Sequence, residues 1–203
     1  MGKYFGTDGF RGEANVQLTA NHAFQVGRYV GWYYGRDHKA KIVIGKDTRR
    51  SSYMFEYALA AGLTASGADA YLLHVTTTPS VSYVVRTEDF DCGVMISASH
   101  NPFYDNGIKL LNGNGQKIEA EVEARIEAYL DGRLEELPYA TREDIGRTVD
   151  FASGRNRYIG HLISIPSCDF KNIKIGLDCS NGSSSAIAKS VFDALRAKTY
   201  VIN

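Results

Sequence analysis

One short segment of the chain, Ser97-Ala98-Ser99-His100-Asn101-Pro102, brings a hydroxyl, an imidazole and an amide together. It follows an apolar run that begins at Cys92, and we expect that run to form a buried strand. Ligand sites of open α/β sheets lie at the ends of such strands. We therefore expect the Ser99 hydroxyl to be exposed and available for reaction.

Two kinds of chemistry could use Ser99. A serine hydrolase would pair it with His100, but neighbours in an extended chain point in opposite directions and no G-x-S-x-G turn surrounds the serine. A serine that carries a phosphoryl group needs nearby cations and backbone N–H groups instead. Pro102 restricts the backbone, and the Asn106–Lys109 segment (NGIK) would bring an ammonium back towards the serine. We favour the phosphoryl carrier; a plain polar turn is the alternative.

Two further segments could bind an anion. In Phe5–Gly12 (FGTDGFRG) the glycines let the backbone fold closely around an anion and Arg11 offers a bidentate guanidinium, although the composition alone favours a simple turn. Asp178–Ser185 (DCSNGSSS) fits either a phosphate site at a helix start or a strand-to-helix turn capped by serines. We leave these two interpretations of Asp178–Ser185 open.

A third polar segment, Lys46–Ser52 (KDTRRSS), is cationic and follows a predicted strand. A strand that leads through hydroxyls into a helix can bind an anion. One acid beside several bases forms structural pairs readily, so we favour an ion pair from Asp47 to Arg49 or Arg50 that holds this loop in shape.

These segments must be positioned by strands and helices that alternate along the chain. The alternation predicts an α/β fold: residues 1–150 form a three-layer domain with a mixed, largely parallel sheet between helices, and residues 151–203 begin a second, similar α/β domain. Thr19 is a predicted N-cap and Pro79 a predicted first-turn residue. The predicted strands are 41–45, 69–75, 92–97, 107–111, 173–179 and 199–202, and the predicted helices are 18–34, 52–66, 80–86, 119–130, 156–164 and 184–197.

Composition excludes several classes of protein. The chain has 203 residues, 44% of them hydrophobic, with 23 basic and 23 acidic side chains. This balance supports a folded core and gives no global attraction for nucleic acid or an anionic membrane. No apolar run is long enough to span a membrane and no signal peptide is evident, so we expect a cytoplasmic protein. Cys92, Cys168 and Cys179 lack zinc or disulfide spacing, and we expect them to be buried.

The chain resembles the phosphohexomutase superfamily in four segments. In order along the chain, these are FGTDGFRG, KDTRRSS, GVMISASHNP and DNGIK. Members of this superfamily have four domains and interconvert the 6- and 1-phosphates of hexoses. The opening MGKYFGTDGFRG, the ISASHNP form and the DNGIK run are most similar to the bacterial branch that acts on glucosamine phosphates. The IKIGLDCSNGSSS run is similar to the start of the second domain, so the resemblance covers essentially the whole chain.

The resemblance implies the conversion of glucosamine 6-phosphate to glucosamine 1-phosphate through a hexose 1,6-bisphosphate, which also serves as activator. Ser99 would be the phosphoserine, and its phosphate would supply one ligand to Mg²⁺. Arg11 and Lys109 would stabilise the charge of the moving phosphoryl group. His100 would transfer a proton or orient the reacting groups, and Asn101 would help to bind phosphate.

The chain also departs from the family pattern. It lacks the metal-binding Asp-Gly-Asp-Gly-Asp-Arg run, the sugar-recognition loop and the phosphate-binding loop of the later domains. A phosphoserine alone should hold Mg²⁺ weakly, so we expect the other metal ligands beyond residue 203 and predict an N-terminal part that is inactive alone. The rival interpretations are a phosphoglucomutase or phosphomannomutase and a non-catalytic module that binds sugar phosphates. The expected partner is a phosphorylated hexosamine or hexose, without nucleic acid or membrane, and a homodimer is left open.

Other chemically tempting residues receive a structural interpretation. The remaining histidines show no metal-ligand spacing, and an aromatic cluster near the end of the first predicted helix fits a core or an interface better than a sugar platform. These residues are His22, His38, His74 and His161, and Tyr29, Trp32, Tyr33 and Tyr34.

Overall fold

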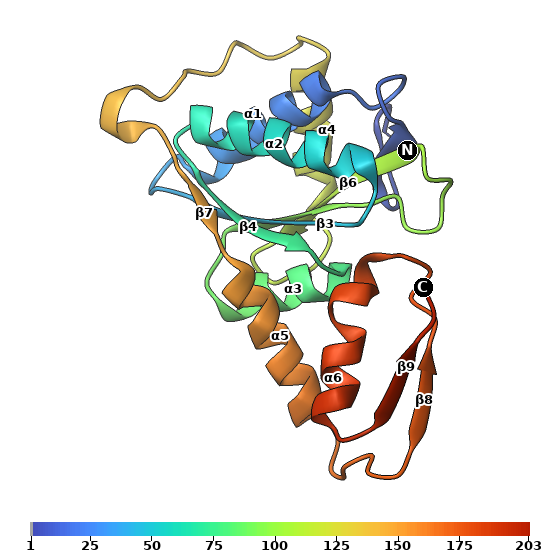
Figure 1. Ribbon diagram of the computed structural model, residues 1–203. Helices are drawn as coiled ribbons and strands as arrows, with labels where there is room; N and C mark the ends of the chain where they lie inside the picture. Colours follow the sequence, from blue (N-terminus) through green and yellow to red (C-terminus); the bar gives the residue numbers. More distant parts are fainter. Residues whose placement is uncertain (1) are drawn as a thin grey trace.

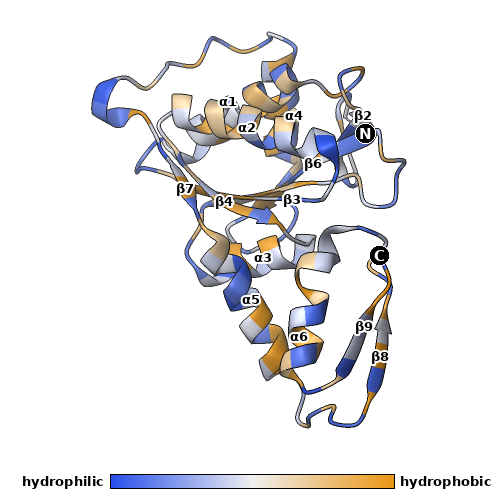
Figure 2. Ribbon diagram, viewed as in Figure 1, coloured by the Kyte–Doolittle hydropathy of each residue, from blue (hydrophilic) through white to orange (hydrophobic). Residues whose placement is uncertain are grey.

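A seven-stranded sheet runs through the first part of the computed structural model, which describes residues 2–203 (Figure 1). Its strand order is β1-β2-β6-β5-β3-β4-β7. Hydrophobic residues lie along β3, which is next to the central strand β5 (Figure 2). The strands are β1 (Phe5–Gly6), β2 (Gly9–Glu13), β3 (Lys41–Lys46), β4 (Asp69–Val75), β5 (Cys92–Ile96), β6 (Asp105–Asn112) and β7 (Thr148–Asp150).

Helices cover both faces of this sheet and make three layers (Figure 1). Three helices lie over the larger apolar cluster on one face; on the other face one helix covers the smaller cluster, and a second begins there and runs away from the sheet. Successive side chains of β5 point to opposite faces of the sheet. Val94 and Ile96 therefore join the larger cluster, and Met95 joins the smaller one. The first group is α1 (Ala20–Tyr34), α2 (Arg50–Ala65) and α4 (Ala120–Leu130), and the second is α3 (Thr78–Thr87) and α5 (Ala152–Ser164).

The sheet changes from parallel to antiparallel pairing at β5. β5 pairs in parallel with β3, whereas β6 runs antiparallel to both β5 and β2. The expected α/β fold with a mixed sheet is confirmed, but three of the six pairings are parallel rather than most of them. The reason is the short connection 97–104, because a parallel return would need a crossover of about a dozen residues or more.

Most predicted elements are found within a few residues of their expected ends. Thr19 is the N-cap of α1, as predicted, and it also forms a capping box with His22. The prediction missed β1, β2 and β7, and the glycines of Phe5–Gly12 conceal a hairpin that turns tightly at Thr7 and Asp8. The long helix predicted over 184–197 is wrong, because a 3-10 turn of serines (Ser183–Ala186) precedes a shorter α6 (Ala188–Ala194).

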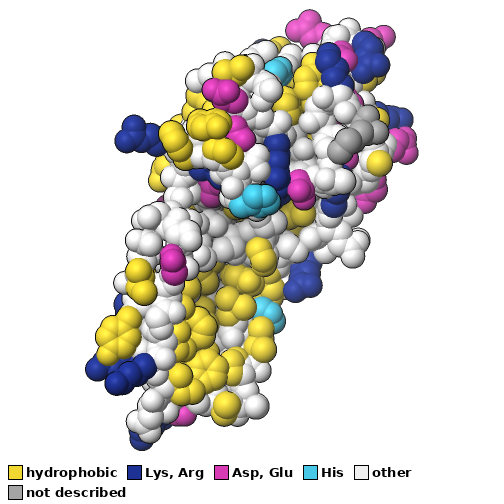
Figure 3. Space-filling view, turned by 90° about the vertical axis from the view of Figure 1, so that its right-hand side faces the viewer, with side chains coloured by type: hydrophobic (Ala, Val, Ile, Leu, Met, Phe, Trp, Pro, Cys, Tyr) yellow, Lys and Arg dark blue, Asp and Glu magenta, His cyan; other side chains and the backbone are white. Residues whose placement is uncertain are grey.

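A smaller unit follows β7. Its strands β8 (Lys174–Leu177) and β9 (Lys198–Val201) pair in parallel, and α6 connects them over a small apolar cluster. Hydrophobic side chains gather on the surface of this lower part of the molecule, where Tyr200 and Ile202 are exposed (Figure 3). The division of the chain at residue 150 stays a prediction. No helix among residues 2–203 has the length and apolar character needed to cross a membrane.

One carboxylate ties the N-terminal strand to α4. The carboxylate of Glu127 accepts hydrogen bonds from the backbone N–H groups of Lys3, Tyr4 and Phe5, with N···O distances of 3.0, 2.7 and 2.8 Å. Burial by itself raises the pKa of Glu127, but these three hydrogen bonds outweigh burial, so its pKa lies below the usual value. The ionised side chain therefore stabilises the docking of β1.

We expect Glu127→Gln to lower the free energy of unfolding by about 1–3 kcal/mol near neutral pH, because a neutral amide replaces a charged acceptor of three N–H groups. The folded-state pKa is below the unfolded one, so the carboxylate contributes fully above the unfolded value and loses its contribution as the pH falls through the folded value. Denaturant unfolding across a pH series measures this difference, with the exposed Glu121→Gln as control. A gap between Glu127→Gln and the unaltered protein that persists in acid would contradict the assignment.

Candidate active site

Ser99, the predicted phosphoserine, lies on the loop between β5 and β6 and is exposed. Its φ angle of 59° lies in the left-handed region, which residues other than glycine seldom adopt. Its backbone N–H donates to Oγ of Ser97 over 3.0 Å. The loop thus holds Ser99 in a strained conformation at the end of β5, and the expected exposure of its hydroxyl is observed.

The side chain of His100 turns towards Ser99. Oγ of Ser99 and Nδ1 of His100 are 3.5 Å apart, so the expectation that these neighbours point in opposite directions is wrong. The reason is the left-handed backbone at Ser99, which is not extended. A separation of 3.5 Å is long for a hydrogen bond, and within residues 2–203 no carboxylate contacts His100. A Ser-His-acid relay is therefore not assembled here.

Two cations lie on the face of the sheet that carries α3. Lys109 is opposite Met95 in the β5–β6 pair, and Arg11 is opposite Gly107 in the β2–β6 pair. Opposite residues of antiparallel strands share a face, so Arg11 and Lys109 point to the same side. A Cβ at Gly107 would lie 2.8 Å from the Ser97 carbonyl and 2.9 Å from Cγ of Arg11, so glycine is required there.

Burial and a neighbouring charge both affect the pKa of Lys109. Burial lowers the pKa of Lys109, and the charge of Arg11 lowers it further. Arg11 contacts Asp8 at 3.3 Å, while its buried Nε has no hydrogen-bond partner among the described residues. The local positive charge that the sequence predicts is thus present, although the chain as a whole is neutral.

An open cavity of about 1380 Å³ lies beside the Ser99 loop. Ser99, His100, Asn101 and Lys109 all line it, whereas Arg11 lies beside Lys109 on the same sheet face but outside the lining. The Asn101 side chain donates to Oδ2 of Asp105 at 2.9 Å, so its amide already helps to hold the loop. The structure therefore brings together four of the five predicted site residues.

Arg49 lies beneath the Ser99 loop and was not among the predicted site residues. Its Nε donates to Oδ2 of Asp47 at 2.9 Å, which confirms the predicted structural ion pair. Its two terminal nitrogens donate to three backbone carbonyls of the loop and to that of Asp105, the first residue of β6. These acceptors are Ser99 at 3.0 Å, Asn101 at 2.8 Å, Asp105 at 3.0 Å and Pro102.

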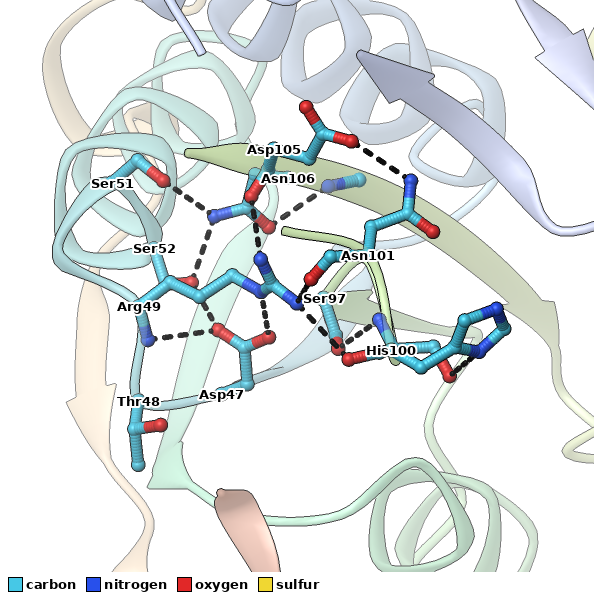
Figure 4. A network of polar contacts seen from close by, with 12 residues as sticks. Asp47, Thr48, Arg49, Ser51, Ser52, Ser97, His100, Asn101, Asp105 and Asn106 are labelled. Atoms are coloured by element: carbon cyan, nitrogen blue, oxygen red, sulfur yellow. Dashed lines mark hydrogen bonds and ion pairs between the residues drawn. The ribbon is translucent and has the colours of Figure 1, made fainter. Parts of the chain in front are cut away.

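A buried polar network fixes Asp47 from the other side (Figure 4). Oδ1 of Asp47 accepts from the Ser52 hydroxyl at 2.6 Å, and that hydroxyl accepts from the Asn106 amide at 2.9 Å. Oδ1 of Asn106 in turn accepts the Gly107 N–H at 2.8 Å. The end of β3, the start of α2 and the start of β6 are therefore joined by hydrogen bonds.

The smaller unit closes one side of the cavity. Residues 180–184 line it, and the Thr48 hydroxyl donates to the Asn181 carbonyl at 2.7 Å. The serines of this turn do not cap the following helix, since Ser185 donates to the Gly182 carbonyl and the N-cap has no side-chain bond. The phosphate interpretation of Asp178–Ser185 stays a prediction.

The remaining histidines have structural partners. His38 contacts Asp91 at 2.8 Å, His74 contacts Asp150 at 3.3 Å, and His161 stacks on a tyrosine of α3. No cluster of three or more His, Cys, Asp or Glu side chains that could hold a metal lies within residues 2–203. Cys92 and Cys179 are buried, but the expectation for Cys168 is wrong because it is exposed.

We expect Asn106→Ala to lower the free energy of unfolding by about 1–3 kcal/mol, because the buried Gly107 N–H loses its acceptor. Urea unfolding monitored by circular dichroism measures the change. The matched control is Asn114→Ala, an exposed turn position where we expect a change within about 0.5 kcal/mol. Equal effects of the two substitutions would contradict the role given to the network.

Comparisons with known proteins agree on one family. Residues 2–136 match the family described as phosphoglucomutase/phosphomannomutase, alpha/beta/alpha domain I. A phosphoglucosamine mutase of Lachnospira eligens is 74% identical over 206 residues, which cover 100% of this chain and 46% of that relative. A phosphoglucosamine mutase of Lachnoclostridium phytofermentans is 71% identical over 203 residues, which cover 100% of this chain and 45% of that relative.

The fold also matches that of a solved structure from the same family. The crystal structure of a phosphoglucomutase/phosphomannomutase family protein from Burkholderia thailandensis matches with a TM-score of 0.81 at 22% identity, over 98% of this chain and 43% of that chain. The chain spans about half the length of the curated relatives it matches. From the match over residues 2–136, the chain belongs to the phosphoglucomutase/phosphomannomutase family.

Proposed function

We propose that this chain is part of a phosphoglucosamine mutase, an intramolecular phosphotransferase in which Ser99 carries the moving phosphoryl group. The observation that carries this proposal is an exposed Ser99 in a cavity that Lys109 also lines. The names of the two relatives above support glucosamine phosphate as the substrate. A phosphorylated hexosamine is thus the proposed partner, and a cytoplasmic location stays an expectation.

In the proposed reaction, the bond between Oγ of Ser99 and phosphorus breaks as the free sugar hydroxyl forms its own bond to the same phosphorus. The proton of the sugar hydroxyl passes to Ser99, and His100, 3.5 Å from Oγ, is the residue that would hold it in transit. The second phosphate of the resulting 1,6-bisphosphate then returns to Ser99 by the reverse chemistry. Lys109 and Arg11 would stabilise the charge that accumulates on the transferred oxygens.

Mg²⁺ enters this proposal through a single ligand, the phosphate on Ser99, and would supply further charge stabilisation when bound. The nearby carboxylates of Asp47 and Asp105 already accept hydrogen bonds from Arg49, Ser52 and Asn101. Mg²⁺ needs an octahedral set of oxygen ligands. The described residues therefore do not form a magnesium site by themselves, which agrees with their lack of a metal-binding cluster.

The longest protein that the gene encodes should form a sugar 1-phosphate when it is incubated with Mg²⁺, a trace of hexose 1,6-bisphosphate and glucosamine 6-phosphate. Phosphorus NMR follows the product, and a parallel reaction with glucose 6-phosphate tests the phosphoglucomutase alternative. A faster reaction with glucose 6-phosphate would overturn the proposed substrate. No product with either sugar, from folded protein phosphorylated on Ser99, would favour a binding module instead.

Residues 1–203 by themselves should form no sugar 1-phosphate in the same assay, because the described residues do not complete a metal site. The measurement needs protein whose folding is checked by circular dichroism. Turnover by this chain alone would contradict the prediction.

Lys109 should set an alkaline limit on activity. Burial lowers its pKa, so the ammonium is lost as the pH rises through a value below that of an ordinary lysine. We expect Lys109→Arg to have a lower kcat/KM than the unaltered protein. The activity that remains should persist to higher pH, because a guanidinium stays charged. Profiles of kcat/KM against pH measure this shift, and identical alkaline limbs would rule out Lys109 as the titrating group.

A further inference from the structure

All N–H donors of the Arg49 guanidinium are engaged. A guanidinium carries five such donors. Nε donates to Asp47, one terminal nitrogen to the carbonyls of Pro102 and Asp105, and the other to the carbonyls of Ser99 and Asn101. The side chain is only 11% exposed. Arg49 thus has no free donor with which to bind a substrate phosphate, although it lies at the edge of the cavity.

The loop carbonyls need these donors. Neither the Ser99 nor the Asn101 carbonyl accepts a backbone N–H among residues 2–203. A backbone carbonyl without a donor is costly unless water replaces it, so the loop would have to rearrange if Arg49 were lost. Arg49 itself cannot shift easily, because Asp47 is anchored to α2 through Ser52.

The same contact fixes the reacting atom. Arg49 binds the carbonyl of Ser99, whose φ angle of 59° sets where its Oγ points relative to Lys109 and His100. Transfer of a phosphoryl group requires the attacking and leaving oxygens to lie roughly in line with phosphorus. A displacement of about 1 Å can reduce such a rate roughly 100-fold.

We propose that Arg49 is a positioning residue that holds the Ser99 loop in the geometry needed for phosphoryl transfer and makes no contact with the substrate itself. This inference rests on the proposed function and adds a residue to it. A lysine cannot replace Arg49, because an ammonium has three donors and lacks the planar fork that reaches four carbonyls and a carboxylate.

The test compares Arg49→Lys with Arg36→Lys in the longest protein that the gene encodes. Arg36 is an exposed arginine that also donates to a backbone carbonyl, that of Tyr33, and neither residue lines the cavity. For Arg49→Lys we expect kcat with glucosamine 6-phosphate to fall roughly 100-fold at an unchanged KM. Arg36→Lys should leave both unchanged. Low concentrations of guanidinium added to Arg49→Ala should restore part of its kcat.

Hydrogen–deuterium exchange tests the loop without substrate. Arg49→Lys should lose protection within residues 97–106 and keep it in β3 and α1. An unchanged kcat, a higher KM at constant kcat, or unchanged exchange in the loop would overturn the proposal. Loss of protection throughout the sheet would also overturn it, since Arg49 would then hold the fold rather than the loop. If the unaltered protein forms no product, the proposed function fails, and the exchange data still decide whether Arg49 positions the loop.

Discussion

The connection between β5 and β6 reverses the chain within a few residues and leaves the Ser99 and Asn101 carbonyls without a backbone N–H donor among the described residues. Both of these carbonyls, with those of Pro102 and of Asp105 at the start of β6, accept hydrogen bonds from Arg49, which Asp47 holds in place. The strained angle at Ser99 and the approach of His100 both belong to this loop. The geometry of the candidate site therefore depends on satisfying the loop backbone from below, by an arginine from a different strand end.

The mixed sheet supplies the rest of the site. Because β6 returns antiparallel beside β5, Lys109 comes back to the strand that ends at the Ser99 loop, and β2 adds Arg11 on the same face. The opposite face carries the larger apolar cluster, so it anchors these strands without competing for the polar surface. The smaller unit then borders the cavity through residues 180–184. The fold thus concentrates positive charge locally in a chain whose net charge is zero.

Local sequence patterns predicted most helices and central strands, because apolar periodicity, the Thr19 cap and Pro79 act over a few residues. They could not show the β1–β2 hairpin, whose glycines resemble a turn, or the direction of β6, which depends on a tertiary pairing. The ion pair of Asp47 with Arg49 spans two positions and was predictable. The contact of Arg49 with the Ser99 carbonyl joins residues 50 positions apart, and no local spacing encodes it.

The most direct test of the proposed function is whether Ser99 itself carries the phosphoryl group. The longest protein that the gene encodes would be incubated with a hexose 1,6-bisphosphate, digested and analysed by mass spectrometry, before and after a chase with glucosamine 6-phosphate. If the bisphosphate carries an ¹⁸O label, we predict one labelled phosphoryl group on Ser99 that passes to the sugar during the chase and is replaced by an unlabelled one. A phosphoryl group on another residue, or a label that stays on Ser99 throughout the chase, would contradict the assignment of Ser99 as the phosphoryl carrier.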